Sequence, residues 1–258
     1  MRKILITNDD GFNSKGIEAL ATLMENFGKV TVVAPLEAQS GMSTALSIGK
    51  PLRFGKIESK SGRELFVCSG TPADCVKMSM NKIFTESPPS LLVSGVNHGS
   101  NTSVAALYSG TLGAAAEGTI YGIPSIAFSL SNFDQEADFS AVIHWGRAII
   151  ENFIEHPPLP GVYLNVNFPS LSKEEIKGVR FAHQGKGRWI NEFEERVDPY
   201  GYDYYWMRGE FFNLEPSSRE SDHNLIEGNY ISIVPHTIDT TSREEKKRLN
   251  ALWKFNTL

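Results

Sequence analysis

Two adjacent carboxylates follow the first apolar run of the chain. The run covers residues 4–7, and Asp9, Asp10 and Gly11 come soon after it. Neighbouring residues of a strand point to opposite faces, so both carboxylates can serve one site only where the strand has ended and the chain turns. Gly11 permits such a turn, and a turn alone is the commonest role of this pattern. No Lys or Arg intervenes before Lys15, so a hard divalent cation is the expected partner of the two charges.

The elements around this turn predict a parallel sheet. The run at 4–7 has the composition of a strand that is buried on both faces. An amphipathic helix over 14–28 and a second β-rich run over 29–35 follow it. Strand, helix and strand in succession form a βαβ unit with a right-handed crossover. Ligands of open α/β sheets bind beyond the carboxyl ends of the strands, which is where Asp9 and Asp10 lie.

The rest of the chain continues the α/β pattern until about residue 186. Further strands are predicted at 64–68, 90–95, 123–129, 162–169 and 230–234, with helices starting at Thr71 and Ser109 and covering 139–155 and 242–254. Between 186 and 212, aromatic residues crowd among charges and glycines without helical spacing. We interpret this stretch as an extended arm or hairpin that a partner subunit covers.

Two further segments are expected at the same edge of the sheet as the acidic pair, and a third could bind phosphate. Residues 36–43, which contain Ser40, follow the second strand, and 96–101, which contain Asn97 and His98, follow the strand at 90–95. The Ser109-Gly110-Thr111 turn opens an Ala-rich helix, whose free N–H groups favour phosphate. Each residue also has a plainer interpretation, because Ser40 fits an ordinary loop, Asn97 a turn and Ser109 a helix cap.

Two other polar residues near these segments have competing interpretations. Asp74 follows Thr71 and Pro72, so capping of the first helical turn is favoured over catalysis. His98 is interpreted as a solvated loop histidine, with protonation of a leaving group as the alternative.

Composition excludes several classes of protein. A net charge of −5 over 258 residues argues against a dedicated nucleic-acid surface. No apolar run reaches the roughly 18 residues of a membrane span, and Met1 is followed almost at once by a strand, so we expect a cytoplasmic protein with no membrane partner. Cys68 and Cys75 are expected to be reduced and buried, because two thiols are too few for a closed zinc site. We expect one domain over 1–258, with the arm and C-terminal region from about 186 protruding from it.

Five motifs in order resemble the SurE family, the survival-protein phosphatases that act as 5′-nucleotidases. They are Asn-Asp-Asp-Gly at 8–11, Ala-Pro with Gln-Ser-Gly within 34–41, Gly-Thr-Pro-Ala-Asp-Cys-Val at 70–76, Ser-Gly-Val-Asn-His-Gly-Ser-Asn at 94–101 and Tyr-Ser-Gly-Thr at 108–111. The match is specific from the N-terminus to about Pro124 and weaker at 227–232. The chain departs from the family pattern at Leu36, where Asp is usual, and at Ser103 and Ala105, where Gly and Asp are usual.

The resemblance implies a Rossmann-like, three-layer αβα core with a mainly parallel sheet and a C-terminal arm through which members form homodimers or homotetramers. It implies one divalent cation per subunit, Mg²⁺ or Mn²⁺, held by Asp9, Asp10, Ser40 and Asn97. Asp9 and Asp10 would be the catalytic residues, and one of them could also act as nucleophile or base. From the residues themselves, we expect the substrate phosphate to lie against Asn8, Gly41, Ser109, Gly110 and Thr111. The implied reaction releases phosphate from nucleoside 5′-monophosphates and, in some members, from 3′-nucleotides or polyphosphate.

The rate acceleration that phosphate-monoester hydrolysis requires also favours a metal ion at this site. Hydrolysis of phosphate monoesters needs accelerations of up to roughly 10²¹-fold, of which acid–base catalysis provides about 10²- to 10⁴-fold. Electrostatic stabilisation must supply the rest. Two carboxylates, a hydroxyl and an amide oxygen favour Mg²⁺ or Mn²⁺ over zinc.

Three other functions compete with a metal-dependent phosphatase. A nucleophilic-aspartate phosphatase normally has Asp-x-Asp after the first strand, which adjacent aspartates do not provide. A serine hydrolase is disfavoured because no Gly-x-Ser-x-Gly follows a strand. A nucleotide- or phosphate-binding regulator could use the same pocket without turnover, and metal-dependent phosphate release would distinguish it from an enzyme.

Overall fold

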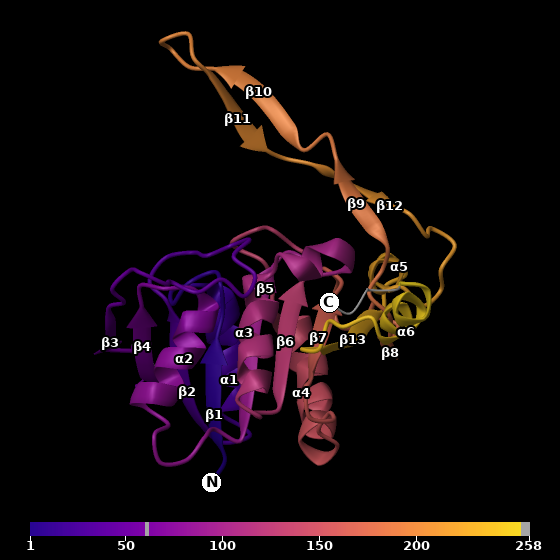
Figure 1. Cartoon of the computed structure of the whole chain (residues 1–258). Coiled ribbons are helices and arrows are strands. Elements are labelled where there is room, and N and C mark those ends of the chain that lie inside the picture. The colour runs from indigo at the N-terminus through magenta and orange to yellow at the C-terminus, as the bar shows by residue number, and fades with distance from the viewer. Residues whose placement is uncertain (60–61, 254–258) are drawn as a thin grey trace, which may run out of the picture.

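The computed structural model describes residues 1–59 and 62–253. Within these residues the centre is a nine-stranded sheet (Figure 1). Its order is β3 (Phe54–Ile57), β4 (Glu64–Cys68), β2 (Lys29–Pro35), β1 (Lys3–Thr7), β5 (Leu91–His98), β6 (Ser125–Leu130), β7 (Val162–Phe168), β13 (Ile231–Thr237) and β8 (Val179–Phe181).

The strands from β4 to β7 in this order all run parallel, which confirms the predicted sheet type. The edges differ, because β3 is antiparallel to β4 and β13 is antiparallel to β7. Strand β1 lies between β2 and β5, where Ile4 pairs with Val30 on one side and Leu91 on the other. The carboxyl ends of β1, β2 and β5 therefore meet at one edge.

Two helices cover each face of this sheet. Helices α1 (Lys15–Met24) and α4 (Ser140–Glu155) lie on one face, and α2 (Pro72–Lys82) and α3 (Gly110–Ile120) on the other (Figure 1). Successive residues of β1 point to opposite cores, since Ile4 packs with α1 and Leu5 with α2 and α3. Both side chains are fully buried, which confirms the predicted two-sided burial and the three-layer architecture.

The predicted caps determine where the helices start. Ser14 accepts a hydrogen bond from Ile17 N at the start of α1. At α2, Thr71 and Asp74 form a reciprocal capping box, with Pro72 as the first helical residue. The capping interpretation of Asp74 is therefore confirmed.

Strand β5 extends beyond residue 95, where the sequence predicted its end. An irregularity in its pairing with β6 between Ser94 and Asn97 lets the strand continue to His98. The interpretation of His98 as a solvated loop residue is wrong: the side chain is 8% exposed and its ring packs edge-on against Phe139, 5.3 Å away between centroids.

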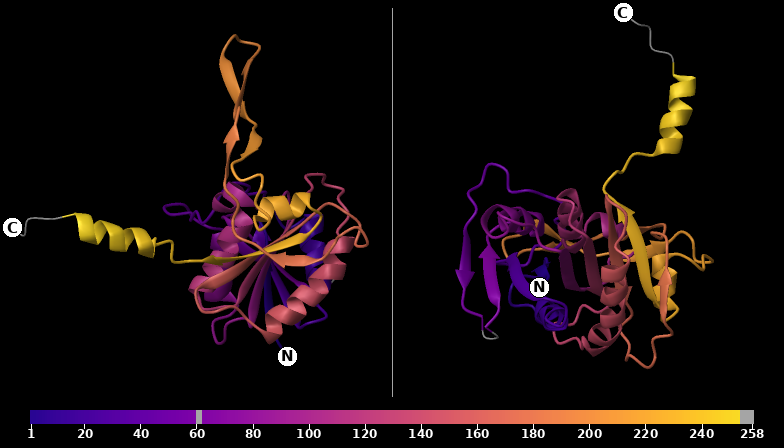
Figure 2. Two further views of the ribbon diagram at one scale, coloured as in Figure 1. Left: turned by 90° about the vertical axis from the view of Figure 1, so that its right-hand side faces the viewer. Right: turned by 90° about the horizontal axis from the view of Figure 1, so that it is seen from below.

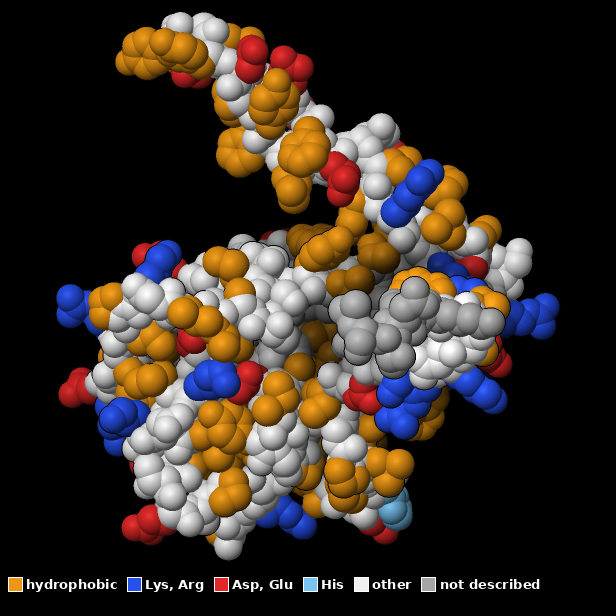
Figure 3. Space-filling view, in the orientation of Figure 1, with side chains coloured by type: hydrophobic (Ala, Val, Ile, Leu, Met, Phe, Trp, Pro, Cys, Tyr) orange, Lys and Arg blue, Asp and Glu red, His pale blue; other side chains and the backbone are white. Residues whose placement is uncertain are grey.

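The aromatic stretch forms a long hairpin, as predicted. Strands β9 (Gly187–Ile190) and β12 (Glu210–Asn213) make its base, and β10 (Phe193–Val197) and β11 (Asp203–Met207) its outer part. The hairpin projects from the body, and hydrophobic side chains gather along it (Figure 3). Tyr200 near its tip is 86% exposed.

A second projection follows β13. Helix α6 (Arg243–Leu252), capped by Ser242, extends away from the sheet and buries none of its described side chains (Figure 2). The helix predicted over 242–254 is confirmed up to this point, and Lys254 lies outside the described residues. Among the residues that are described, no helix combines the length and apolar character needed to cross a membrane.

The two cysteines are free and buried, as predicted. Cys68 ends β4 and Cys75 lies in the first turn of α2. A hydrogen bond with Cys75 lowers the pKa of Cys68 to about 7, while burial raises the pKa of Cys75.

Candidate active site

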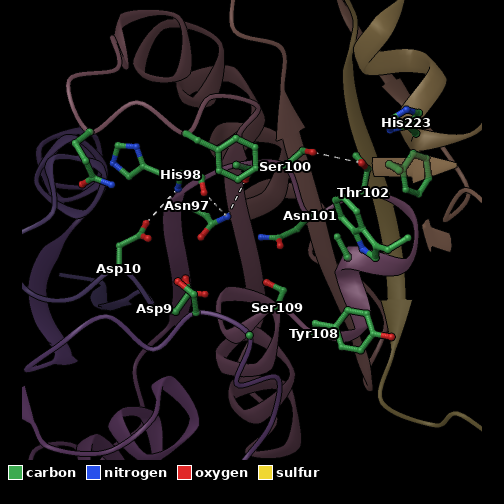
Figure 4. Close-up of a pocket in the computed structure, with 18 residues that line it drawn as sticks. Asp9, Asp10, Asn97, His98, Ser100, Asn101, Thr102, Tyr108, Ser109 and His223 are labelled. Atoms are coloured by element: carbon green, nitrogen blue, oxygen red, sulfur yellow. Dashed lines mark hydrogen bonds between the residues drawn. The ribbon is translucent and has the colours of Figure 1, made fainter. Parts of the chain in front are cut away.

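A cavity of about 500 Å³, drawn in Figure 4, opens at the carboxyl ends of β1 and β5. It brings together side chains from four segments that sequence analysis had singled out. The residues from these segments that sequence analysis discussed and that line the cavity are Asp9, Asp10, Ser40, Gly41, Asn97, His98 and Ser109.

Asp9 is almost completely buried, at 3% exposure, just beyond β1. The Thr111 hydroxyl donates a hydrogen bond to its Oδ1 atom. Burial raises the pKa of Asp9 to about 6, and the neighbouring charge of Asp10 acts in the same direction, while the bond from Thr111 opposes them. The side chain is thus held in a defined position at an electrostatic cost.

Asp10 faces the same cavity from the next position. Its Oδ2 atom accepts the backbone N–H of His98 at 3.1 Å, and burial raises its pKa. No Lys or Arg occurs among the described residues that line the cavity. The acidic pair therefore has no Lys or Arg partner among these residues, although a positive charge on the neighbouring His98 would lower the pKa of Asp10.

Asn97 presents an oxygen towards this pair. Its Nδ2 atom donates to the carbonyl of Gly99 at 2.7 Å, which orients the amide so that Oδ1 remains free (Figure 4). Within the described part of the chain, no group of three or more His, Cys, Asp and Glu residues could hold a metal. A cation here would therefore rely on two carboxylates with the neutral oxygens of Asn97 and Ser40, a donor set that fits Mg²⁺ or Mn²⁺.

Two glycines of α3 allow the acidic turn and the Ser40 loop to approach this helix closely. A Cβ atom on Gly110 would lie 2.9 Å from the Cβ atom of Asp9. A Cβ atom on Gly113 would lie 1.9 Å from the carbonyl oxygen of Ser43. Any side chain at either position would push the loops apart.

The residues expected to hold phosphate divide into two groups. Gly41 and Ser109 line the cavity, and Ser109 also caps α3 by accepting from Leu112 N. Asn8, Gly110 and Thr111 do not line it. The Asn8 amide donates to Gly11 O at 2.9 Å and Ser14 Oγ at 2.8 Å, and Thr111 is turned to Asp9. These contacts place Asn8 and Thr111 behind the acidic turn.

A buried amide network supports the floor of the cavity. Asn101 donates its backbone N–H to Asn167 Oδ1 at 2.7 Å, and its carbonyl accepts from Asn165 Nδ2 at 2.9 Å. Asn165 and Asn167 are fully buried on β7. Sequence analysis did not select them, although polar residues alternating with apolar ones in this strand were a signal.

The hairpin base supplies a wall that sequence analysis also missed. Trp189 of β9, Phe211 of β12 and His223 of α5 (Asp222–Glu227) line the cavity. The aromatic crowding was visible in the sequence, but it was assigned only to contacts with a partner subunit.

Comparisons with known proteins show which family this chain resembles. A family model described as "Survival protein SurE" matches residues 4–191. The proteins named 5′-nucleotidase SurE from Flavobacterium johnsoniae and Cytophaga hutchinsonii are 45% and 42% identical to this chain, in each case over 98% of it and 97% of the relative. The crystal structure of the SurE protein from Aquifex aeolicus superposes with a TM-score of 0.83 at 35% identity, over 97% of this chain and 99% of that one. The motifs, the fold and these matches lead to one conclusion: the chain belongs to the SurE family.

Proposed function

We propose that this chain is a metal-dependent phosphomonoesterase that hydrolyses nucleoside 5′-monophosphates to nucleoside and phosphate. The observation that carries the proposal is an acidic pair, Asp9 almost completely buried and Asp10 partly buried, in a cavity that no Lys or Arg of the described residues lines. The name 5′-nucleotidase SurE, borne by relatives over nearly their whole length, supports the substrate class.

Asp9, Asp10, Ser40 and Asn97 would hold one Mg²⁺ or Mn²⁺ ion. When bound, such an ion neutralises phosphoryl oxygens and makes a coordinated water more acidic. Thr111 and the His98 backbone keep the two carboxylates in place through their hydrogen bonds. These bonds allow the acidic pair to be oriented before substrate arrives, so less reorganisation is needed during the reaction.

Gly41 and Ser109 would contact the phosphate. Both line the cavity, and Ser109 lies at the N-terminus of α3, where the helix dipole favours an anion. Gly110 and Thr111 contribute by letting Asp9 approach this terminus, and Asn8 by holding the turn at Gly11.

We also propose that residues 1–258 form one domain that assembles as a homodimer or homotetramer through the hairpin and α6. The exposed apolar side chains of the hairpin support this assembly. The buried free thiols agree with a cytoplasmic location, where thiols stay reduced.

Phosphate release from AMP in the presence of Mn²⁺ or EDTA tests the activity. Asp10→Asn should lower kcat/KM by roughly 10²-fold or more, because it removes charge from the site. Asp239→Asn, which changes an exposed carboxylate on the way to α6, should leave the rate unchanged. A near-normal rate for Asp10→Asn would exclude Asp10 from the mechanism, and AMP binding without release under any metal would indicate a regulator.

A further inference from the structure

The cavity is acidic on one side and aromatic on the other. In Figure 4, Tyr108 and His223 lie across the cavity from Asp9 and Asp10. On the aromatic side, the Trp189 and Phe211 rings meet edge-to-face with centroids 5.9 Å apart. Phe211 in turn lies 4.4 Å from the His223 ring. These rings form a continuous wall at the hairpin base.

This wall is firmly attached to the body although the rest of the hairpin projects. Asp222 is fully buried, and its Oδ1 atom accepts the backbone N–H of Gly185 at 2.9 Å, just before β9. Its Oδ2 atom accepts the N–H of Ser103 at 3.0 Å. The Ser103 hydroxyl then donates to Gly185 O at 2.7 Å. The aromatic wall is therefore held in a fixed position relative to the loop that lines the cavity.

We propose that this wall binds the nucleobase of the substrate, with the Trp189 indole as the main stacking surface. The inference rests on the proposed function, because it assigns the base end of the same site. A nucleoside monophosphate carries its charge at one end and a flat aromatic ring at the other, which is the polarity of the cavity. Between the two ends, Ser100 and Thr102 offer hydroxyl groups near the place of the sugar.

Stacking explains which substrates the site selects. A base stacked on an aromatic side chain is recognised by its flat surface more than by its hydrogen-bonding groups. Trp189 therefore favours nucleotides over phosphate esters without an aromatic ring, and discriminates little among the bases. The competing explanation is that the rings only pack the hairpin onto the body, in which case their loss would affect every phosphate ester equally.

The test compares two substrates that share phosphate and ribose. In Trp189→Ala, kcat/KM for AMP should fall roughly 10-fold or more, mainly through KM, while that for ribose 5-phosphate changes less than about 2-fold. Trp189→Phe should restore most of the loss for AMP. Trp206→Ala is the matched control, because Trp206 belongs to the same hairpin, is 56% exposed and does not line the cavity. Equal losses for the two substrates, or none for AMP, would overturn the proposal.

Binding measured without turnover separates this proposal from the proposed activity. In EDTA, saturation-transfer NMR should detect adenosine, but not ribose, on the wild type and on Trp206→Ala, and neither ligand on Trp189→Ala. This pattern supports the aromatic site even if the wild type releases no phosphate, an outcome that would reject only the phosphatase. Adenosine binding that is undetectable in the wild type, or unchanged in Trp189→Ala, would reject the nucleobase site while leaving the activity assay unaffected.

Discussion

Asp9 is almost completely buried in a cavity that no Lys or Arg of the described residues lines. Its native pKa of about 6 lies above the ordinary value of 3.8, so the native state binds more protons than the unfolded state between these values. In metal-free protein the free energy of unfolding should therefore fall as pH rises through about 4 to 6, and this residue accounts for about 3 kcal/mol of the fall. Urea denaturation in EDTA across this range measures the slope.

A substitution and a metal ion provide the controls for this slope. Asp9→Asn keeps an oxygen for the Thr111 hydroxyl but removes the charge, so in EDTA at pH 8 the variant should be more stable than the wild type. Saturating Mn²⁺ should reverse the order, because binding stabilises only a folded chain that can bind the metal. If the variant were the less stable in EDTA, hydrogen bonding to the carboxylate would outweigh the cost of burying it.

Sequence alone predicted the acidic half of the cavity and not the aromatic half. Asp9, Ser40 and Asn97 come from segments that follow neighbouring parallel strands, so strand order is enough to bring them together. Trp189 reaches the same cavity from the base of the hairpin, and His223 reaches it from α5. No periodicity or spacing specifies where such a hairpin attaches.

At the scale of elements, Asp222 connects three segments. It accepts the backbone N–H of His223 in its own helix α5, of Gly185 just before β9, and of Ser103 in the segment after β5. Asp222→Ala would leave these buried donors without an acceptor, which should cost roughly 3 kcal/mol or more. Urea denaturation measures the loss, and KM for AMP should rise because the base of the hairpin loosens.

Two variants make this prediction specific. Asp222→Asn retains one acceptor oxygen and should lose less stability than Asp222→Ala. Glu86→Ala removes an exposed carboxylate and should change stability by less than about 0.5 kcal/mol. If Asp222→Ala unfolded at the wild-type urea concentration, water would satisfy the three donors and the hairpin base would not depend on this residue.

Helices and strands were predicted most accurately where apolar periodicity and nearby capping residues indicated the same element. The βαβ unit and the capped helices have apolar periodicity and capping residues that lie close together in the chain. Strands β3 and β8 were missed because they are short, have few buried side chains and form at the sheet edge through pairing with partners already in place. Strand β5 is longer than predicted because its pairing with β6 resumes after an irregularity.

At the scale of the whole molecule, two arms leave one compact body. The hairpin exposes Phe193, Val197, Tyr205 and Met207, which the pairing of β10 with β11 places on one face. Helix α6 lies apart from the sheet and buries none of its described side chains. A monomer in water would gain nothing from displaying these apolar groups, so both arms are expected to be covered by other copies of the chain.

The hairpin can be shortened without removing the cavity wall, because β9 and β12 line the cavity whereas β10 and β11 do not. Replacing residues 192–208 by an Asn-Gly turn should reduce the mass in solution and leave kcat/KM for AMP nearly unchanged. Removing residues 242–258 tests the other arm in the same way. Light scattering coupled to size exclusion measures both masses: if each arm builds a different interface of a tetramer, each truncation yields dimers and their combination yields monomers. Unchanged mass for both truncations would mean that neither arm holds the assembly together, and the exposed aromatic face of the hairpin would then require a different partner.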